Sequence, residues 1–336
     1  MNGYQIHIHM FDRKLSAISK VPKVISENKL YKGVKNNTGL HGLDPIIIYN
    51  LSKDLNFTII TTIGKTKSDF GHVFSNGTAN GAIGRVLDGK ANMSGNGRFI
   101  VYYNSEKFEY SVAYFWDTIV LMVPKSPKLT QWAKIGASSL FKFTAKSYFY
   151  PEIKTFKELD KINLPINTHQ TDLFNMNADS QVLNNLRRKI IQLGSNMTSM
   201  HIAAYLKTVA AVERKYDAMT LIALYYTDQY GVPLLHIVEE FVRSHYLGYI
   251  VSKGFPFLPV INNLLTQYSE FGFCKKWKGD FYSSLILEMQ YTRTFESSDT
   301  ITVTLKDLEV PFMVLAAGLV TSIFVFLIEL NMKHFH

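Results

Sequence analysis

The residues of this chain whose spacing indicates a covalent chemistry are asparagines in short glycosylation motifs. Each begins an Asn-x-Ser/Thr triplet without an intervening proline: Asn36, Asn56, Asn76, Asn92 and Asn196. Such triplets accept N-linked glycans in chains that enter the secretory pathway. The motif is short and the chain is rich in Asn, Ser and Thr, so chance is the alternative explanation. We expect a glycoprotein with an extracellular or lumenal body.

The other residue types do not form a motif that is typical of a catalytic or metal site. The chain has 10 histidines, but they lack metal-ligand spacing. His7 and His9 would share one face of a strand, and two ligands without a third make a weak zinc site. A glycine-rich phosphate loop and a nucleophile elbow are both missing. The sequence therefore predicts no metal, no cofactor and no enzyme activity.

Composition indicates a globular body with one strongly apolar segment. The 336 residues are 47% hydrophobic and 19% charged, which is too apolar for disorder and too polar for many membrane spans. The net charge is +9, but the basic residues are scattered, so nucleic acid is not an expected partner. The single Cys274 cannot form an intrachain disulfide.

The apolar segment lies near the C-terminus. From Val310 to Leu330 the chain offers 21 residues with a single charge at Glu329, or about 31 Å of helix. We expect a single-pass membrane helix over 310–330 with a cytoplasmic C-terminus; a buried soluble helix is the alternative. Met1 to Phe11 alternates like a core strand rather than a signal peptide. We therefore expect either that the chain is truncated upstream or that the apolar helix is a tail anchor.

Strand and helix patterns alternate along the rest of the chain. The predicted elements are a strand over 1–11, a helix and strand over 44–63, a helix ending at Gly89, a strand over 116–124, and a helix capped by Thr155 and Glu158. This alternation predicts an α/β fold with largely parallel sheets.

In this order the segments resemble the ligand-binding halves of the ionotropic glutamate receptor superfamily, particularly its divergent insect chemosensory ionotropic receptors. The segments that carry the resemblance are 3–13, 44–58, 80–92, 111–125, 151–159, 253–262, 270–277 and 304–330. Asn92 stands where the family often has Asp. The resemblance implies a bilobed module like the type II periplasmic binding proteins, followed by one C-terminal transmembrane helix.

The chain departs from the family pattern between its two halves, where the pore-forming segments would lie. No apolar run near 18 residues occurs between Ile135 and Pro151, so the chain lacks its own pore. We expect residues 1–135 to form the first half and 136–150 a remnant linker. Residues 151–305 would form the second half, returning to the first lobe from about 252, and 306–336 the membrane helix and tail.

The resemblance also implies positions for ligand-binding groups. An arginine that holds the ligand carboxylate would correspond to Lys107, with Arg98 as second choice and Tyr102 as a nearby hydroxyl. Alternatively, Lys107 is a solvated residue at a strand edge. Thr171 would cap a helix N-terminus that binds a distal acid, or would cap it without any ligand.

The resemblance places the acid that binds the ligand's ammonium near Thr220 or Leu221, and Asp217 is the nearest carboxylate. Because neither position holds an acid, we expect that glutamate is not the ligand. The favoured function is a chemosensory receptor subunit of the ligand-gated cation channel family, in the cell membrane, with possible co-receptor subunits. A membrane-tethered decoy or auxiliary subunit is the main alternative, and a bacterial solute-binding protein a distant third.

Overall fold

The computed structural model describes residues 1–13, 16–20, 23, 31, 33–64, 67–74, 76–101, 107–126, 152–168, 180–194, 197–228, 231–294 and 309–333. The chain divides into two compact units. One contains Met1–Lys125 and Ile153–Arg293, and the other contains Ser126–Glu152 and Thr294–His336. The predicted boundary between residues 135 and 136 and the linker 136–150 lie outside the described residues.

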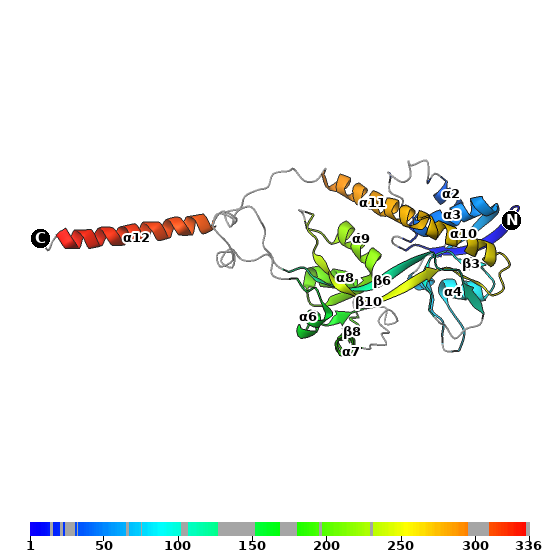
Figure 1. The fold of residues 1–336 in the computed structure, drawn as a ribbon, viewed down its shortest axis with the longest axis horizontal. Helices are drawn as coiled ribbons and strands as arrows, with labels where there is room; N and C mark the ends of the chain where they lie inside the picture. Colours follow the sequence, from blue (N-terminus) through cyan, green and yellow to red (C-terminus); the bar gives the residue numbers. More distant parts are fainter. Residues whose placement is uncertain are drawn as a thin grey trace. The chain divides into compact units, whose positions relative to one another are not determined.

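The first lobe is built on a sheet whose strands come from both halves of the first unit (Figure 1). In spatial order the strands are β2 (Phe57–Gly64), β1 (Tyr4–Phe11), β3 (Met93–Ser94), β11 (Ile250–Ser252) and β5 (Phe108–Tyr110). Strand β1 runs parallel to β2 and β3, whereas β11 is antiparallel to β3 and β5. The strand predicted at the N-terminus is confirmed, because Ile6, Ile8 and Met10 point into the core.

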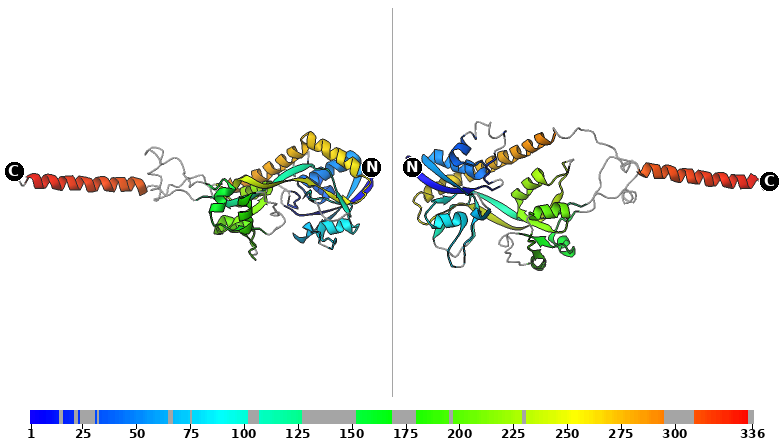
Figure 2. Two further views of the ribbon diagram at one scale, coloured as in Figure 1. Left: turned by 60° about the horizontal axis from the view of Figure 1, so that its bottom comes forward. Right: turned by 180° about the vertical axis from the view of Figure 1, so that it is seen from behind.

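Helices cover both sides of this sheet. They are α2 (Val34–Thr38), α3 (Leu43–Leu55), η2 (Lys67–Phe70), α4 (Gly81–Leu87), α10 (Leu258–Glu270) and α11 (Phe273–Thr294). Figures 1 and 2 show α2, α3, α10 and α11 on one side of the strands and α4 on the other. Phe281 of α11 packs in a buried cluster with Ile46 and Tyr49 of α3, so the late helix α11 is part of the first lobe.

The second lobe contains the other sheet. Its strands, in spatial order, are β4 (Arg98–Phe99), β10 (Leu235–Gly248), β6 (Phe115–Pro124), β9 (Ala210–Arg214), β7 (Ile166–Asn167) and β8 (Ile190–Ile191). The accompanying helices are α6 (Phe156–Lys161), α7 (Gln181–Arg188), α8 (Ser199–His201), the π-helix η5 (Ile202–Leu206) and α9 (Lys215–Tyr225). The predicted capping box between Thr155 and Glu158 is confirmed at the start of α6.

The expectation of largely parallel sheets is only partly correct. Strands β9, β7 and β8 are parallel, but β4, β10, β6 and β9 pair antiparallel. The long strands β6 and β10 carry the chain between the lobes, and they pair with each other in opposite directions (Figure 1). The local alternation of helix and strand patterns does not reveal that a strand late in the chain, β10, pairs antiparallel with the earlier β6.

One buried carboxylate, that of Asp44 in the first turn of α3, joins the segments where the chain passes between the two sheets. Its Oδ1 accepts hydrogen bonds from the hydroxyls of Tyr114 at 2.6 Å and Tyr249 at 2.9 Å. Its Oδ2 accepts from the amide of Gly97 at 2.9 Å and from the hydroxyl of Ser16. Asp44 is only 1% exposed, and the four donors compensate for burying its charge.

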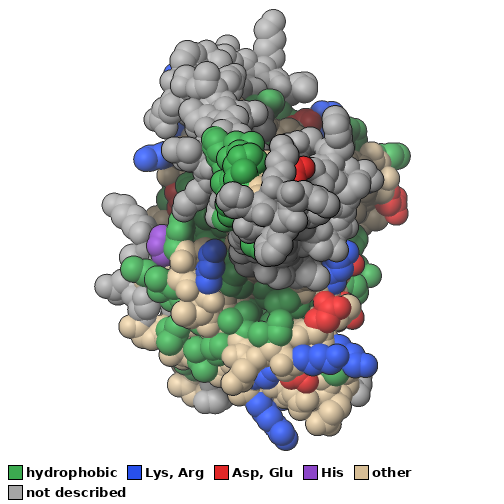
Figure 3. All heavy atoms as spheres, turned by 90° about the vertical axis from the view of Figure 1, so that its left-hand side faces the viewer, with side chains coloured by type: hydrophobic (Ala, Val, Ile, Leu, Met, Phe, Trp, Pro, Cys, Tyr) green, Lys and Arg blue, Asp and Glu red, His purple; other side chains and the backbone are tan. Residues whose placement is uncertain are grey.

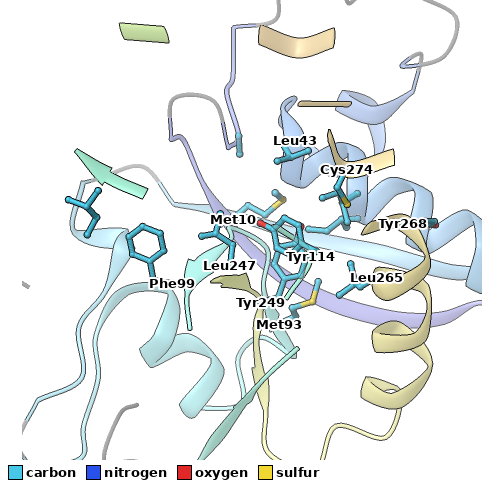
Figure 4. Close-up of a cluster of buried hydrophobic side chains, with 14 of the residues drawn as sticks. Met10, Leu43, Met93, Phe99, Tyr114, Leu247, Tyr249, Leu265, Tyr268 and Cys274 are labelled. Carbon is cyan, nitrogen blue, oxygen red and sulfur yellow. The ribbon is translucent and has the colours of Figure 1, made fainter. Parts of the chain in front are cut away.

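Three of these donors lie at passages between the sheets. Gly97 follows β3 and precedes β4, Tyr114 immediately precedes β6, and Tyr249 separates β10 from β11. The rings of Tyr114 and Tyr249 stack with their centroids 4.7 Å apart in the core (Figure 4). A Cβ at position 97 would lie 1.8 Å from the hydroxyl oxygen of Tyr114, so only glycine fits there.

The second unit contains α12 (Glu309–Lys333), which includes the segment 310–330 predicted to cross a membrane. Measured over the residues that the structure describes, none of the helices combines the length and apolar character that a membrane crossing requires. The membrane helix predicted over 310–330 is therefore not confirmed.

On the face drawn in Figure 3, Lys and Arg side chains are interspersed with acidic and apolar ones rather than gathered into one stripe. This agrees with the scattered basic residues of the sequence. It gives no support to a continuous basic surface on that face.

We expect Asp44→Asn to destabilise the first unit by about 3 kcal/mol, because an amide cannot accept the four hydrogen bonds that the carboxylate receives. Urea unfolding measures the change. The control Tyr249→Phe removes a single donor and should cost about 1 kcal/mol. An Asp44→Asn chain as stable as the unsubstituted protein would contradict this account of the fold.

Candidate ligand site

Charged side chains of both lobes meet at the carboxyl ends of parallel strands. Arg13 follows β1 in the first sheet, and Arg214 is the last residue of β9 in the second. Helix α9 begins at the next residue, Lys215. In open α/β sheets, ligands bind outside the carboxyl ends of the strands. The topology therefore brings ionisable groups to the position where such folds hold their ligands.

An ion pair connects the two lobes at this position. The guanidinium of Arg13 donates to the carboxylate of Asp217 over 3.2 Å, although the two residues are 204 positions apart in the chain. Their side chains are only 19% and 17% exposed. Asp217 lies in the first turn of α9, where the helix dipole also favours a negative charge. The pair thus joins the loop after β1 to the start of α9.

Two further arginines lie against aromatic rings beside this pair. The guanidinium carbon of Arg98 is 4.0 Å from the ring centroid of Phe70, and that of Arg13 is 5.9 Å from the same ring. The guanidinium carbon of Arg214 lies 3.8 Å from the ring centroid of Phe99. Aromatic faces attract cations electrostatically, so these rings contribute to holding the guanidinium groups in place.

Helix α11 supplies a fourth cation. The ammonium nitrogen of Lys278 is 3.1 Å from the ring centroid of Tyr216 in α9 and 3.8 Å from that of Phe115 at the start of β6. A helix of the first lobe therefore touches the first turn of α9 in the second lobe. We call the following residues the junction cluster: Arg13, Arg98, Asp117, Glu213, Arg214, Asp217 and Lys278.

Burial shifts the proton affinities within the junction cluster. Burial and the charge of Asp217 raise the pKa of Glu213 to about 7. Burial lowers the pKa of Lys278 to about 7, against the attraction of Asp117 and Asp217, and lowers that of Arg214 to about 10. Burial also raises the pKa of the Asp117 carboxyl. Strongly shifted ionisable groups are characteristic of functional sites.

The structure brings together two of the binding residues suggested by the sequence. Arg98 and Asp217 both belong to the junction cluster, the first through the Phe70 ring that it shares with Arg13. Lys107 is exposed immediately before the edge strand β5. Thr220 is 1% exposed, and its hydroxyl donates to the carbonyl of Tyr216 within the helix. Its hydroxyl proton is therefore engaged in local helix structure.

Two other suggested residues, Tyr102 and Thr171, lie outside the described residues. Near Thr220 and Leu221, where the resemblance places the ammonium-binding acid, the structure has two carboxylates. Glu213 is the next-to-last residue of β9, and Asp217 lies in the first turn of α9. The expectation that glutamate is not the ligand stays a prediction.

Sequence reasoning missed Arg13, Arg214 and Lys278. A usable signal for Arg214 was present, since it follows the apolar run Ala210 to Val212 and precedes a helical pattern. Charged residues at the end of a predicted parallel strand merit attention as ligand-binding candidates. Lys278 gave no such signal, because its role depends on where α11 packs.

The glycosylation motifs differ in accessibility. Asn36, Asn56 and Asn76 are exposed, whereas Asn92 is half-buried and its side-chain oxygen accepts from the amide of His7. Asn196 lies outside the described residues. The sequence analysis overlooked Asn50, whose triplet lies inside α3. Attachment of glycans remains a prediction for all of these positions.

Among the described residues, the structure contains no group of three or more His, Cys, Asp or Glu side chains arranged to hold a metal ion. Two hollows lie elsewhere on the surface. One of about 530 Å³ borders α7 at Gln181, Asn184, Arg187 and Arg188. The other, of about 420 Å³, lies beside α4 at residues that include Asp69, Arg85 and Lys90. Neither is lined by residues of the junction cluster.

Solved structures with a similar fold are ligand-binding domains of ionotropic glutamate receptors. Muscle GluRIIB of Drosophila in complex with glutamate matches with a TM-score of 0.61 and 12% identity, over 83% of this chain and 98% of that chain. The glycine complex of the Pleurobrachia bachei iGluR3 ligand-binding domain matches with a TM-score of 0.57 and 14% identity, over 84% and 98%. The D-serine complex of a Mnemiopsis leidyi iGluR ligand-binding domain matches with a TM-score of 0.56 and 14% identity, over 84% and 99%.

These likenesses establish the fold as the bilobed α/β fold of ionotropic glutamate receptor ligand-binding domains, which are receptor modules rather than enzymes. At such low identity they establish nothing finer. No protein-family model matches the sequence. No curated protein matches it either.

We expect the Arg13–Asp217 pair to couple the two lobes energetically. In a double-mutant cycle with Arg13→Met and Asp217→Asn, the coupling free energy from urea unfolding should be about 1 kcal/mol, because both side chains are largely shielded from water. The exposed pair Lys90–Asp88, with side chains 64% and 54% exposed, serves as the control. Its coupling should stay below about 0.3 kcal/mol. Equal coupling for both pairs would contradict an interlobe contact.

The raised pKa of Glu213 predicts a pH dependence of stability. The folded state holds this proton more tightly than the unfolded state, where the pKa is 4.5. The contribution of Glu213 to stability should therefore fall as pH rises from about 4.5 to about 7. The pKa of Lys278 is lowered from 10.5 to about 7, so Lys278 affects stability above pH 7. In that range the free energy of unfolding should rise with pH.

Glu213→Gln should reduce the fall in the free energy of unfolding between pH 4.5 and pH 7, as measured by urea unfolding. Glu270→Gln, at an exposed position at the end of α10, is the control and should leave the decline unchanged. A decline of the same size in the Glu213→Gln chain would assign the effect to other groups.

Proposed function

We propose that this chain is the small-molecule-binding module of a receptor in the ionotropic glutamate receptor superfamily, and that its ligand binds between the lobes at the junction cluster. The observation that carries the proposal is that Arg13 and Phe99 from the first half and Lys278 of α11 converge on the start of α9. A ligand placed there would contact both lobes, and closure of two lobes on a ligand is a common switching movement.

The similar folds support this proposal, since those receptor domains were solved with glutamate, glycine or D-serine. In this chain, the cluster contains both cations and carboxylates. It also lies at the carboxyl ends of β1 and β9, where α/β folds bind their ligands. Two lobes held by an ion pair of moderate strength can separate when a ligand competes for the charged groups.

We further propose a chemosensory subunit at the cell surface, with the binding module outside the cell and α12 as a tether. The support for the tether is that large apolar side chains along α12 are exposed, among them Leu315, Val320 and Phe324. The support for the chemosensory role is the sequence resemblance. Because the sequence offers no apolar run near 18 residues between Ile135 and Pro151, we propose that the chain binds ligand without forming a pore itself. A co-receptor subunit would then conduct ions, or the chain would act as a decoy.

Ligand binding at the junction cluster can be tested with a panel of glutamate, glycine, D-serine, short carboxylates, alkylamines and alcohols. Saturation-transfer NMR identifies binders, and calorimetry measures their affinities. We expect at least one binder whose affinity falls roughly fivefold or more in Asp217→Asn or Arg13→Met chains. The chain with Asp88→Asn and Lys90→Met, which removes an exposed ion pair, is the control and should bind normally.

The proposal fails if no compound binds. It also fails if the affinity of every binder is indifferent to the substitutions at Arg13 and Asp217.

A further inference from the structure

We propose that the ligand is a small organic carboxylate without an amino group, and that the guanidinium of Arg214 binds it at the first turn of α9. This inference rests on the proposed ligand site and adds the chemistry of the ligand and the residue that selects it.

Arg214 is a buried cation without an ion pair among the described residues. The residue is only 6% exposed, and its guanidinium carbon lies over the ring of Phe99, 3.8 Å from the ring centroid. Three described carboxylates, those of Asp217, Asp117 and Glu213, act on it, but at longer range than an ion pair. A buried guanidinium normally has an anionic partner, because an uncompensated buried charge is costly. Its planar fork also matches the two oxygens of a carboxylate.

The start of α9 provides a second reason to expect an anion. Arg214 is the N-cap residue of this helix of 11 residues, and its side chain does not cap the helix by a hydrogen bond. The first-turn N–H groups and the helix dipole favour a negative charge at this end. The buried guanidinium and the helix terminus therefore act on the same small region.

Two acids of the junction cluster, Asp217 and Asp117, already interact with cations of the chain itself. Arg13 is paired with Asp217 at 3.2 Å. The ammonium of Lys278 lies over Tyr216 and Phe115 and is attracted by both Asp117 and Asp217. Glu213 accepts the backbone amide of Arg214 at 3.1 Å. A ligand ammonium that approached Asp217 or Asp117 would therefore have to compete with Arg13 or Lys278.

This arrangement separates the chain from proteins of the same fold that were solved with amino acids. Glutamate, glycine and D-serine each carry an ammonium group beside their carboxylate. In this chain, Lys278 places an ammonium of its own over two aromatic rings at the site, where Asp117 and Asp217 attract it. We assign to Lys278 the exclusion of amino-group ligands, and to Arg214 the attraction of the carboxylate.

Four probes of equal carbon number test the ligand class with the full chain: butyrate, butyramide, butylamine and 2-aminobutyrate. By calorimetry at pH 6, butyrate should bind roughly tenfold or more tightly than each of the others, because butyrate alone combines a carboxylate with the absence of an amine.

Two substitutions at Arg214 test its role. Arg214→Met should weaken butyrate binding roughly tenfold or more, and Arg214→Lys should give a smaller loss, because lysine retains the charge but not the planar fork. Arg188→Met, on exposed α7, is the control and should bind butyrate normally. Thermal unfolding of each variant verifies that it is folded. Unchanged butyrate affinity in a folded Arg214→Met chain would overturn the role of Arg214.

The variant Lys278→Met gives an independent test, because it removes the ammonium of Lys278. Its affinity for 2-aminobutyrate should rise several-fold relative to its affinity for butyrate. Butylamine or 2-aminobutyrate binding more tightly than butyrate to the unsubstituted chain would overturn the inference. If such binding still depended on Asp217, the proposed function would survive. Failure of all four probes to bind would overturn the inference, and the broader panel described above would decide the function separately.

Discussion

The structure depends on the carboxylate of Asp44 more than on any other single group. It accepts hydrogen bonds from Gly97, Tyr114 and Tyr249, at three of the places where the chain passes between the two sheets. Because a buried carboxylate needs its donors, these passages cannot shift independently without leaving a charge uncompensated. The glycine at position 97 lets one passage approach the Tyr114 hydroxyl closely. The frame between the lobes is thus fixed by chemistry as well as by packing.

The junction cluster lies beyond this fixed frame and is held together by contacts of another kind. Arg13 pairs with Asp217 at the partly shielded start of α9, while Arg214 and Lys278 rest against aromatic rings. Such contacts exchange more readily than a fully buried hydrogen-bonded carboxylate, because solvent or a ligand can replace them. A rigid connection combined with an exchangeable set of interlobe contacts is what a module that closes on a ligand requires.

The sequence predicted the local elements well where one periodic pattern determined them. The strand at the N-terminus, the helix and strand following Gly42, and the capping box at Thr155 all depend on neighbours within a few positions, and all are present in the structure. The antiparallel pairing of β6 with β10 was not predicted, because strands so distant along the chain leave no local signature of their direction.

The candidate site was predicted only in part for the same physical reason. Arg98 and Asp217 were suggested by resemblance, but Arg13 meets Asp217 across 204 positions, and Lys278 reaches Tyr216 only because α11 packs on the first lobe. Counting along an unaligned sequence also cannot show that Glu213 lies next to last in β9, just before the helix that carries Asp217. Contacts created by tertiary packing set the charges of this site.

Native-state hydrogen exchange provides the most direct measurement of the central claim, that Asp44 fixes the passages between the lobes while the start of α9 stays exchangeable. The amides of Gly97, which donates to Asp44, and Tyr249, which donates to Ser111, should belong to the slowest class and exchange only on global unfolding. The first-turn amides of α9 should exchange faster, through local opening. Rapid exchange of Gly97 and Tyr249, independent of each other and of global stability, would contradict the account.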